Sequence, residues 1–162
     1  MDEDRYLKLV FDMRSKLYHA AQAILWNDQD AADAVQEAIL KGWRRRNSLH
    51  DEARFEAWFM RILINQCRDE LRRRKRNRML LENCAERERL NLGIKDGPDV
   101  FEALQLLPEE QRLPALLHYF HGYLVRDVSE ILGIHVGQVQ SRLRTARKKL
   151  KALLAEGRDR CE

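Results

Sequence analysis

Polar and basic side chains gather along one side of the stretch from residue 136 to residue 155. Between Ser141 and Ala155 there are six Lys or Arg residues and no acidic residue. Amide, hydroxyl and guanidinium groups contact base edges in a DNA groove, while Lys and Arg neutralise phosphates. The stretch is therefore a candidate DNA-binding surface, although a basic helix face can also be simply solvated. The candidate side chains are Gln138, Gln140, Ser141, Arg144, Thr145 and Lys148.

A second basic stretch runs from Leu71 to Arg78, where six of eight residues are Lys or Arg. Trp58 and Phe59 lie upstream of it. Aromatic rings stack on unpaired bases while cations neutralise the backbone, an arrangement that suits single-stranded nucleic acid. The same two rings would serve equally well as core residues of a helix, and composition alone favours that interpretation.

No pattern in the sequence indicates catalysis. His118 and His121 are three residues apart on a predicted helix, but no carboxylate or cysteine stands at ligand spacing, and a metal site needs three or four ligands. A glycine-rich phosphate loop, a nucleophile motif and a carboxylate pair are all missing from the sequence. We therefore expect no enzyme activity, no metal and no other cofactor. A helical hydrolase using the two histidines is the weakest alternative.

A helix-turn-helix is the element that would position the first basic stretch. Apolar residues recur at helical spacing from Val125 to Leu132, and Gly133 then suits a left-handed turn. From Val136 to Leu153 apolar residues follow in steps of three and four, which is typical of a long amphipathic helix. A short helix, a glycine turn and a long basic helix can place the second helix in a DNA major groove.

The rest of the chain predicts helices as well, and hence an all-α fold. No glycine or proline stands between Gly42 and Gly93, and β-branched residues are sparse. We expect Asp30 to cap the second helix. The first three helices are expected over residues 6–26, 30–46 and 55–76. The apolar face expected for the first contains Leu7, Val10, Phe11, Leu17, Tyr18, Ala21, Ile24 and Leu25, interrupted by Arg14.

Two small helical domains joined by a linker are expected. The linker covers residues 77–99, which are acidic in their second half and end with Gly97 and Pro98. A second unit follows over 100–162. Pro108 suits the first position of a helix, whereas Pro114 removes one helical hydrogen bond and should kink that helix or reset its start. The residues of this helix expected to face inward are Leu113, Leu116, Leu117 and Phe120.

Composition bounds the class of protein. Of the 162 residues, 44% are hydrophobic and 35% are charged, which suits small folded helical units, and the net charge is +4. No apolar run approaches the ~18 residues needed to span a bilayer, and the acidic N-terminus lacks a signal-peptide core. Three cysteines without CxxC spacing suit free thiols. We therefore expect a cytoplasmic protein with no membrane insertion. The cysteines are Cys67, Cys84 and Cys161.

Two stretches, taken together, resemble the extracytoplasmic-function (ECF) sigma factors of bacterial RNA polymerase. Residues 30–43, DAADAVQEAILKGW, followed by residues 55–76, FEAWFMRILINQCRDELRRRKR, are similar to their region-two domain. Residues 107–150, LPEEQRLPALLHYFHGYLVRDVSEILGIHVGQVQSRLRTARKKL, are similar to their region-four domain. The resemblance implies a region-two domain over 1–76 and a region-four domain over 100–162.

The resemblance implies that the protein binds core RNA polymerase and directs it to promoters. Region two would melt the upstream promoter element and hold it as a single strand, with residues 47–55 as the loop that captures a flipped base. The residues implied on its promoter-recognition helix are Trp58, Arg61, Asn65, Arg68, Asp69 and Arg72. Region four would contact the distal duplex element with the long basic helix.

Protein partners are implied in the same way. The residues that would bind the β′ clamp helices of polymerase are Asp33, Gln36, Glu37 and Lys41. The β flap of polymerase and an anti-sigma factor are further implied partners. Gln138 and Gln140 stand where the family commonly has Thr and a basic residue, which bears on the promoter sequence rather than on the class.

A stand-alone helix-turn-helix regulator is the alternative function. It would need a dimer interface or a ligand pocket in the N-terminal half, and a basic helix tail there argues against a sensor domain. Retention of core polymerase distinguishes the two hypotheses.

Overall fold

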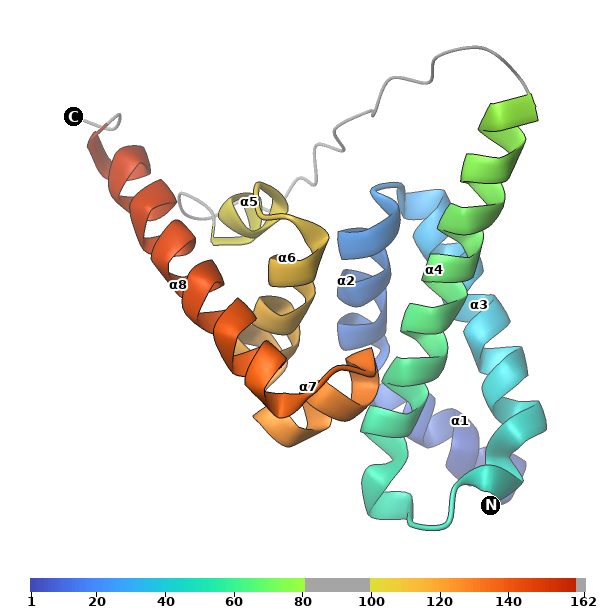
Figure 1. Ribbon diagram of the computed structural model, residues 1–162. Helices are drawn as coiled ribbons and strands as arrows, with labels where there is room; N and C mark the ends of the chain where they lie inside the picture. Colours follow the sequence, from blue (N-terminus) through green and yellow to red (C-terminus); the bar gives the residue numbers. More distant parts are fainter. Residues whose placement is uncertain (81–99, 160–162) are drawn as a thin grey trace. The chain divides into compact units, whose positions relative to one another are not determined.

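The computed structural model describes residues 1–80 and 100–159, and within these ranges every regular element is a helix (Figure 1). This confirms the expected all-α class. The chain divides into two compact units, Met1–Leu90 and Asn91–Glu162. The predicted linker 77–99 stays a prediction, because residues 81–99 lie outside the described ranges. Cys84 and Cys161 lie outside them too.

Four helices build the first unit, with two short 3₁₀ turns between the last two. Helices α2, α3 and α4 pack against one another. Helix α3 runs antiparallel to α4, because the start of α3 near residue 30 meets α4 near residue 74, whereas α3 near residue 42 meets α4 near residue 59. Across the described residues, none of the helices is both long enough and apolar enough to cross a membrane. The elements are α1 (Glu3–Asp12), α2 (Arg14–Leu25), α3 (Asp28–Arg45), the turns Arg46–Ser48 and Glu52–Arg54, and α4 (Phe55–Leu80).

The single helix expected over residues 6–26 is in fact two helices. Met13 separates them with φ −101° and ψ 9° and is buried. The break changes which residues face inward, so Tyr6 and Val10 are buried while Leu7 and Phe11 are 47% and 61% exposed, contrary to the prediction. The Arg14 guanidinium lies 4.0 Å from the centre of the Phe11 ring and shields one face of it.

The start of α3 is fixed by Asn27 rather than by Asp30, so the predicted cap was wrong. Asn27 has an extended backbone, and its side-chain oxygen accepts a hydrogen bond of 2.9 Å from the Asp30 N–H. Asp30 therefore lies inside the first turn, where a negative charge is favoured by the helix dipole. This leaves the Asp30 carboxylate available for a partner outside α3.

Tyr6 holds α1 against the α3–α4 pair. Its hydroxyl donates a 2.8 Å hydrogen bond to the Ile39 carbonyl, and its ring packs edge-on to Phe55 at 5.8 Å. Trp43 and Phe59 complete the ring cluster. Burial raises the pKa of the Tyr6 phenol, so it remains a hydrogen-bond donor across the physiological range.

In the second unit, α8 packs against α5, α6 and α7. Gly133, with φ 67°, ends α7 in the left-handed conformation expected of it. Arg112 is 6% exposed and donates to the Leu107 carbonyl at 2.8 Å, so it satisfies a carbonyl in the turn between α5 and α6. The elements are α5 (Val100–Gln105), α6 (Glu109–Ala115), one π-helical turn (Leu116–Phe120), α7 (Val125–Leu132) and α8 (Val136–Asp159).

Pro114 does not reset its helix, because α6 runs through it from Glu109 to Ala115. The chain then widens into the π-helical turn, in which the His121 N–H bonds the Leu116 carbonyl at 3.0 Å. The wider turn shifts later residues around the axis, so Phe120 is 46% exposed and its predicted inward position was wrong. Pro108 is the N-cap rather than the first helical residue.

Gly42→Ala should destabilise the first unit by about 1–3 kcal/mol, because the core there is already filled. A Cβ at this position would meet the Tyr6 hydroxyl and lie 2.9 Å from Phe59 Cε2. Urea unfolding followed by tryptophan fluorescence measures this directly, since Trp26, Trp43 and Trp58 all belong to the first unit.

Two controls accompany this substitution. In a Tyr6→Phe background the cost of Gly42→Ala should fall, because the hydroxyl that meets the new methyl group is gone. Gly137→Ala adds a Cβ that meets nothing within 4 Å, so circular dichroism should show no loss of stability. An equal cost for Gly42→Ala with and without the Tyr6 hydroxyl would contradict the packing argument.

Candidate nucleic-acid interface

The turn between α7 and α8 is closed by Ser129. Its hydroxyl donates to the Ile134 carbonyl at 2.5 Å, and its own carbonyl accepts the Ile134 N–H at 3.1 Å. Gly133, at φ 67°, occupies the one position of the turn where a side chain would be strained. These contacts fix the direction in which α8 leaves the turn.

One stripe of α8 is buried and the opposite side is exposed. Val139, Leu143, Ala146 and Leu150 are at most 8% exposed. Val136, the first residue of α8, was predicted to belong to the same stripe but is 42% exposed, so that prediction was wrong. All six residues predicted to bind the distal duplex are exposed: Gln138, Gln140, Ser141, Arg144, Thr145 and Lys148.

Two of these six side chains are used within the helix itself. The Gln138 side-chain oxygen accepts the His135 N–H at 3.1 Å, the reciprocal half of a capping box. The Thr145 hydroxyl donates to the Ser141 carbonyl at 3.1 Å. Within residues 1–80 and 100–159, no side-chain bond holds Gln140, Arg144 or Lys148, so these remain available to an external partner.

The predicted recognition residues on α4 differ in whether they make contacts within the protein. Arg61 and Asn65 are exposed, and among the described residues they bond no other side chain. Asp69 and Arg72 are also exposed, but they pair with each other at 2.9 Å. Arg68 is half-buried and makes contacts within the protein.

Trp58 is half-buried, whereas Phe59 is fully buried. Phe59 therefore belongs to the core and has no face open to a base. The Trp58 ring packs against Phe55 at 5.7 Å, and its indole N–H donates to the Ser48 hydroxyl at 3.3 Å. The indole thus joins the start of α4 to the loop before it.

The loop expected to capture a flipped base, residues 47–55, is held at several points. Asp51 caps its second short turn by accepting the Ala53 N–H at 3.0 Å. Glu52 pairs with Arg5 of α1, with the Arg5 Nε 2.6 Å from a Glu52 oxygen. Arg46 lies 3.8 Å above the Trp43 ring and donates to the Trp43 carbonyl. Contacts from α1, α3 and α4 therefore position this loop.

The four residues predicted to bind polymerase lie on α3 and differ in exposure. Asp33 and Gln36 are exposed, while Glu37 and Lys41 are half-buried. The Gln29 amide bonds Asp33 at 3.3 Å within the helix. Lys41 reaches across to the side chain of Gln66 on α4, so it also contributes to packing between the two helices.

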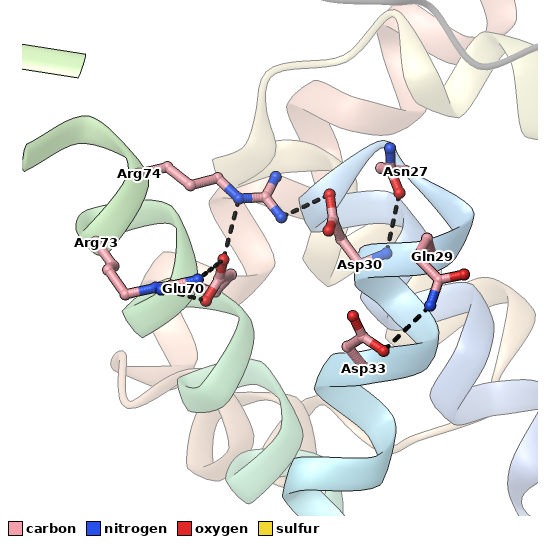
Figure 2. A network of polar contacts seen from close by, with 7 residues as sticks. All are labelled: Asn27, Gln29, Asp30, Asp33, Glu70, Arg73 and Arg74. Atoms are coloured by element: carbon pink, nitrogen blue, oxygen red, sulfur yellow. Dashed lines mark hydrogen bonds and ion pairs between the residues drawn. The ribbon is translucent and has the colours of Figure 1, made fainter. Parts of the chain in front are cut away.

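Sequence patterns missed a charged network between α3 and α4, drawn in Figure 2. One Arg74 guanidinium lies 2.6 Å from Asp30 and 3.2 Å from Glu70, and Glu70 also pairs with Arg73 at 2.8 Å. Hydrogen bonds from Arg73 and then Arg74 lower the pKa of the Glu70 carboxyl against the opposing effect of burial. The carboxylate is therefore ionised at neutral pH. The Glu70–Arg74 spacing of four residues was visible in the sequence, whereas the link to Asp30 was not.

The histidine pair shows no metal-binding geometry. His118 Nδ1 lies 2.7 Å from the Tyr123 carbonyl, within the turn that follows α6. Over the described part of the chain, no three His, Cys, Asp or Glu side chains are grouped as ligands would be.

Two family descriptions match this chain in order along the sequence. Sigma-70 region 2 matches residues 9–77, and Sigma-70 region 4 matches residues 99–150. The first match covers the loop before α4 and α4 itself as far as residue 77, and the second covers α7, the turn and α8 as far as residue 150. The class defined by fold and site is thus a sigma factor of the Sigma-70 type with two helical regions.

Curated relatives and solved structures narrow the class. The ECF RNA polymerase sigma factor SigM of Mycobacterium tuberculosis is 33% identical over 140 residues, which cover 86% of this chain and 71% of SigM. RNA polymerase sigma factor SigV of Bacillus subtilis is 28% identical, covering 91% of this chain and 89% of SigV. The sigma factor RpoE of Bartonella quintana, solved with the anti-sigma factor NepR, has a TM-score of 0.79 and 25% identity, covering 94% of this chain and 98% of RpoE. The chain belongs to the ECF sigma factors.

Gln138→Ala should lower the stability of the second unit by about 0.5–1 kcal/mol, because the His135 N–H loses its acceptor. Gln138→Glu should retain stability, since a carboxylate can accept the same bond near a helix N-terminus. Urea unfolding followed by circular dichroism measures both variants. Gln140→Ala is the matched control, since no bond within the described part of the chain depends on it. A similar loss for the Gln140 variant would contradict the capping role of Gln138.

Proposed function

We propose that this ECF sigma factor binds core RNA polymerase and directs it to specific promoters, with each unit contacting a different form of DNA. The observation that carries the proposal is the exposed polar face of α8, directly opposite its buried stripe, in a chain that also matches Sigma-70 region 2 over residues 9–77. A helix packed on one side and polar on the other fits a major groove.

In region four, base contact is assigned to the α8 side chains that the protein leaves without internal partners. Arg144 and Gln140 lie one turn apart and can bond base edges, while Lys148 suits phosphate contact. Gln138 and Thr145 have one atom each committed to the helix, but the Gln138 amide N–H₂ still faces solvent as a donor. Ser141 lies between these two sets of side chains.

In region two, α4 and the loop before it are proposed to hold the melted strand. Arg61 and Asn65 are exposed and suited to an unstacked base and its phosphate. We assign the half-buried Trp58 ring, which bonds Ser48, to contact with a base in the loop rather than to free stacking. Arg68, Asp69 and Arg72 continue the same helix toward its basic end.

Helix α3 is proposed to bind polymerase through Asp33, Gln36, Glu37 and Lys41 on the β′ clamp helices, with region four on the β flap. An anti-sigma factor is a further proposed partner. Support comes from two solved complexes, that of the RpoE sigma factor with NepR and that of CnrH with the cytosolic domain of CnrY, which has a TM-score of 0.69. On this proposal the protein acts in the cytoplasm and carries no enzyme activity of its own.

Core polymerase should be retained by the tagged chain in a pull-down, and the reconstituted holoenzyme should start transcripts from a subset of a promoter library. A stand-alone regulator would retain no core enzyme and would bind duplex DNA by itself. The first pattern supports the proposal, and the second would replace it with the regulator.

Arg144→Ala should reduce transcription from the cognate promoter by about tenfold, because a good base contact contributes about 1–3 kcal/mol of discrimination. Affinity for core polymerase should be unchanged. Arg147→Ala removes the same charge from the flank of α8 and serves as the matched control for general electrostatic loss. Equal losses for the two variants, or a parallel loss of polymerase binding, would argue against base contact by Arg144.

A further inference from the structure

The basic end of α4 does not present all its charges to solvent in the same way. Arg72 pairs with Asp69 at 2.9 Å and Arg73 pairs with Glu70 at 2.8 Å. Arg74 pairs with Asp30 of α3 at 2.6 Å. In the described residues, no acid or other side chain pairs with Lys75 or Arg76, and both are exposed. The run of cations is therefore divided into a neutralised part and an open part.

The Arg74–Asp30 pair differs in kind from the others. The side chains of Arg74 and Asp30 are 26% and 32% exposed, whereas those of Arg72 and Arg73 are 70% and 64% exposed. A partly buried pair is less screened by salt than an exposed one. The Arg74 guanidinium bonds Glu70 with Nε and Asp30 with another nitrogen, so it joins two helices through a planar group (Figure 2).

We propose that the Asp30–Arg74–Glu70 network divides the basic residues near the end of α4 between two roles. Arg74 is a positioning residue that holds this end of the helix on the start of α3. Lys75 and Arg76 are the cations that bind promoter phosphates, without regard to base identity. The inference rests on the proposed function, and it adds a backbone-binding site beyond the residues assigned to the melted strand.

Lys75 and Arg76 lie far along α4 from the residues proposed to bind the melted strand. At a rise of 1.5 Å per residue, Lys75 lies roughly 15 Å along the helix from Asn65. Neighbouring phosphates of one strand are spaced by less than half of that length, so Lys75 and Arg76 reach a different part of the backbone. Phosphate contacts of this kind set position and affinity but carry no sequence preference.

Holoenzyme affinity for promoter DNA, measured against salt concentration, tests the open cations. Lys75→Gln and Arg76→Gln should each reduce the slope of log K against log salt by about 0.7–0.9, the value for one phosphate contact. The loss should be the same on the cognate promoter and on promoters with altered bases. Arg73→Gln, which removes a neutralised charge from the same turn, should change the slope less. An equal change for Arg73 and Arg76, or none for Arg76, would overturn the assignment.

Asp30→Asn tests the positioning role, because positioning and simple electrostatics predict opposite changes in DNA affinity. The substitution makes the protein more positive by one charge, so simple electrostatics expects tighter DNA binding. If the Asp30–Arg74 pair positions Lys75 and Arg76, binding should weaken by about threefold to tenfold, the scale of one charge-assisted hydrogen bond. Asp30→Glu should recover most of the loss. Tighter or unchanged binding by Asp30→Asn would refute the positioning role.

Affinity for core polymerase separates this inference from the proposed function. Failure of the wild-type protein to bind core enzyme would refute the proposed function. If wild-type protein binds core enzyme and transcribes, and the Lys75 and Arg76 variants have the same DNA affinity and salt dependence as wild type, only the phosphate site is refuted. Loss of core affinity in Arg76→Gln would mean that this cation contacts polymerase instead, which also refutes the phosphate site. Tryptophan fluorescence confirms that each variant retains a folded first unit.

Discussion

The close approach of α3 to α4 at Gly42 is the constraint on which the first unit depends. The absence of a side chain there lets the Phe59 ring and the Tyr6 hydroxyl meet the backbone of α3. Once this point is fixed, the antiparallel register of the two helices follows, and it places Lys41 beside Gln66 and Asp30 beside Arg74. The surface proposed to bind polymerase and the surface proposed to bind the promoter are therefore built on one packing contact.

The second unit is under a different constraint, because α8 packs on the rest of the unit through only one of its sides. A stripe of four buried residues does this for α8, and the turn before it sets the helix direction through Ser129 and the left-handed Gly133. The cost of the exposed polar face is small, because the side chains on it are solvated or bonded to their own helix. The stripe that packs α8 onto its unit and the face proposed to contact DNA thus lie on opposite sides of the same helix.

Helical periodicity predicted the all-α class and the helix-turn-helix, because these depend on local spacing around Val128, Ile131 and Val139. It failed at Leu7 and Phe11, because the break at Met13 gives α1 a different inward face from α2, and at Phe120, because a π-helical turn after Pro114 shifts that residue around the axis. The cap of α3 was misassigned because Asn27 and Asp30 are both good capping residues, and only the backbone decides between them. The Asp30–Arg74 contact could not be predicted, since it joins residues 44 positions apart through a register that only packing fixes. The DNA-binding role of α8 remains a prediction from its residue pattern, and the roles of the α3 and α4 residues remain predictions from resemblance.

Helix α4 is one uninterrupted element of 26 residues, which Trp58 ties near its start to the loop before it and Arg74 ties to α3. Inserting or deleting a single residue between Phe59 and Arg74 would turn the far end by about 100° and shift it by 1.5 Å. The guanidinium would then point away from its carboxylate while the near end stayed seated in the core. On the proposed function, the length of this segment therefore keeps Lys75 and Arg76 at a fixed distance from Arg61 and Asn65, so that the two proposed promoter contacts cannot shift relative to each other.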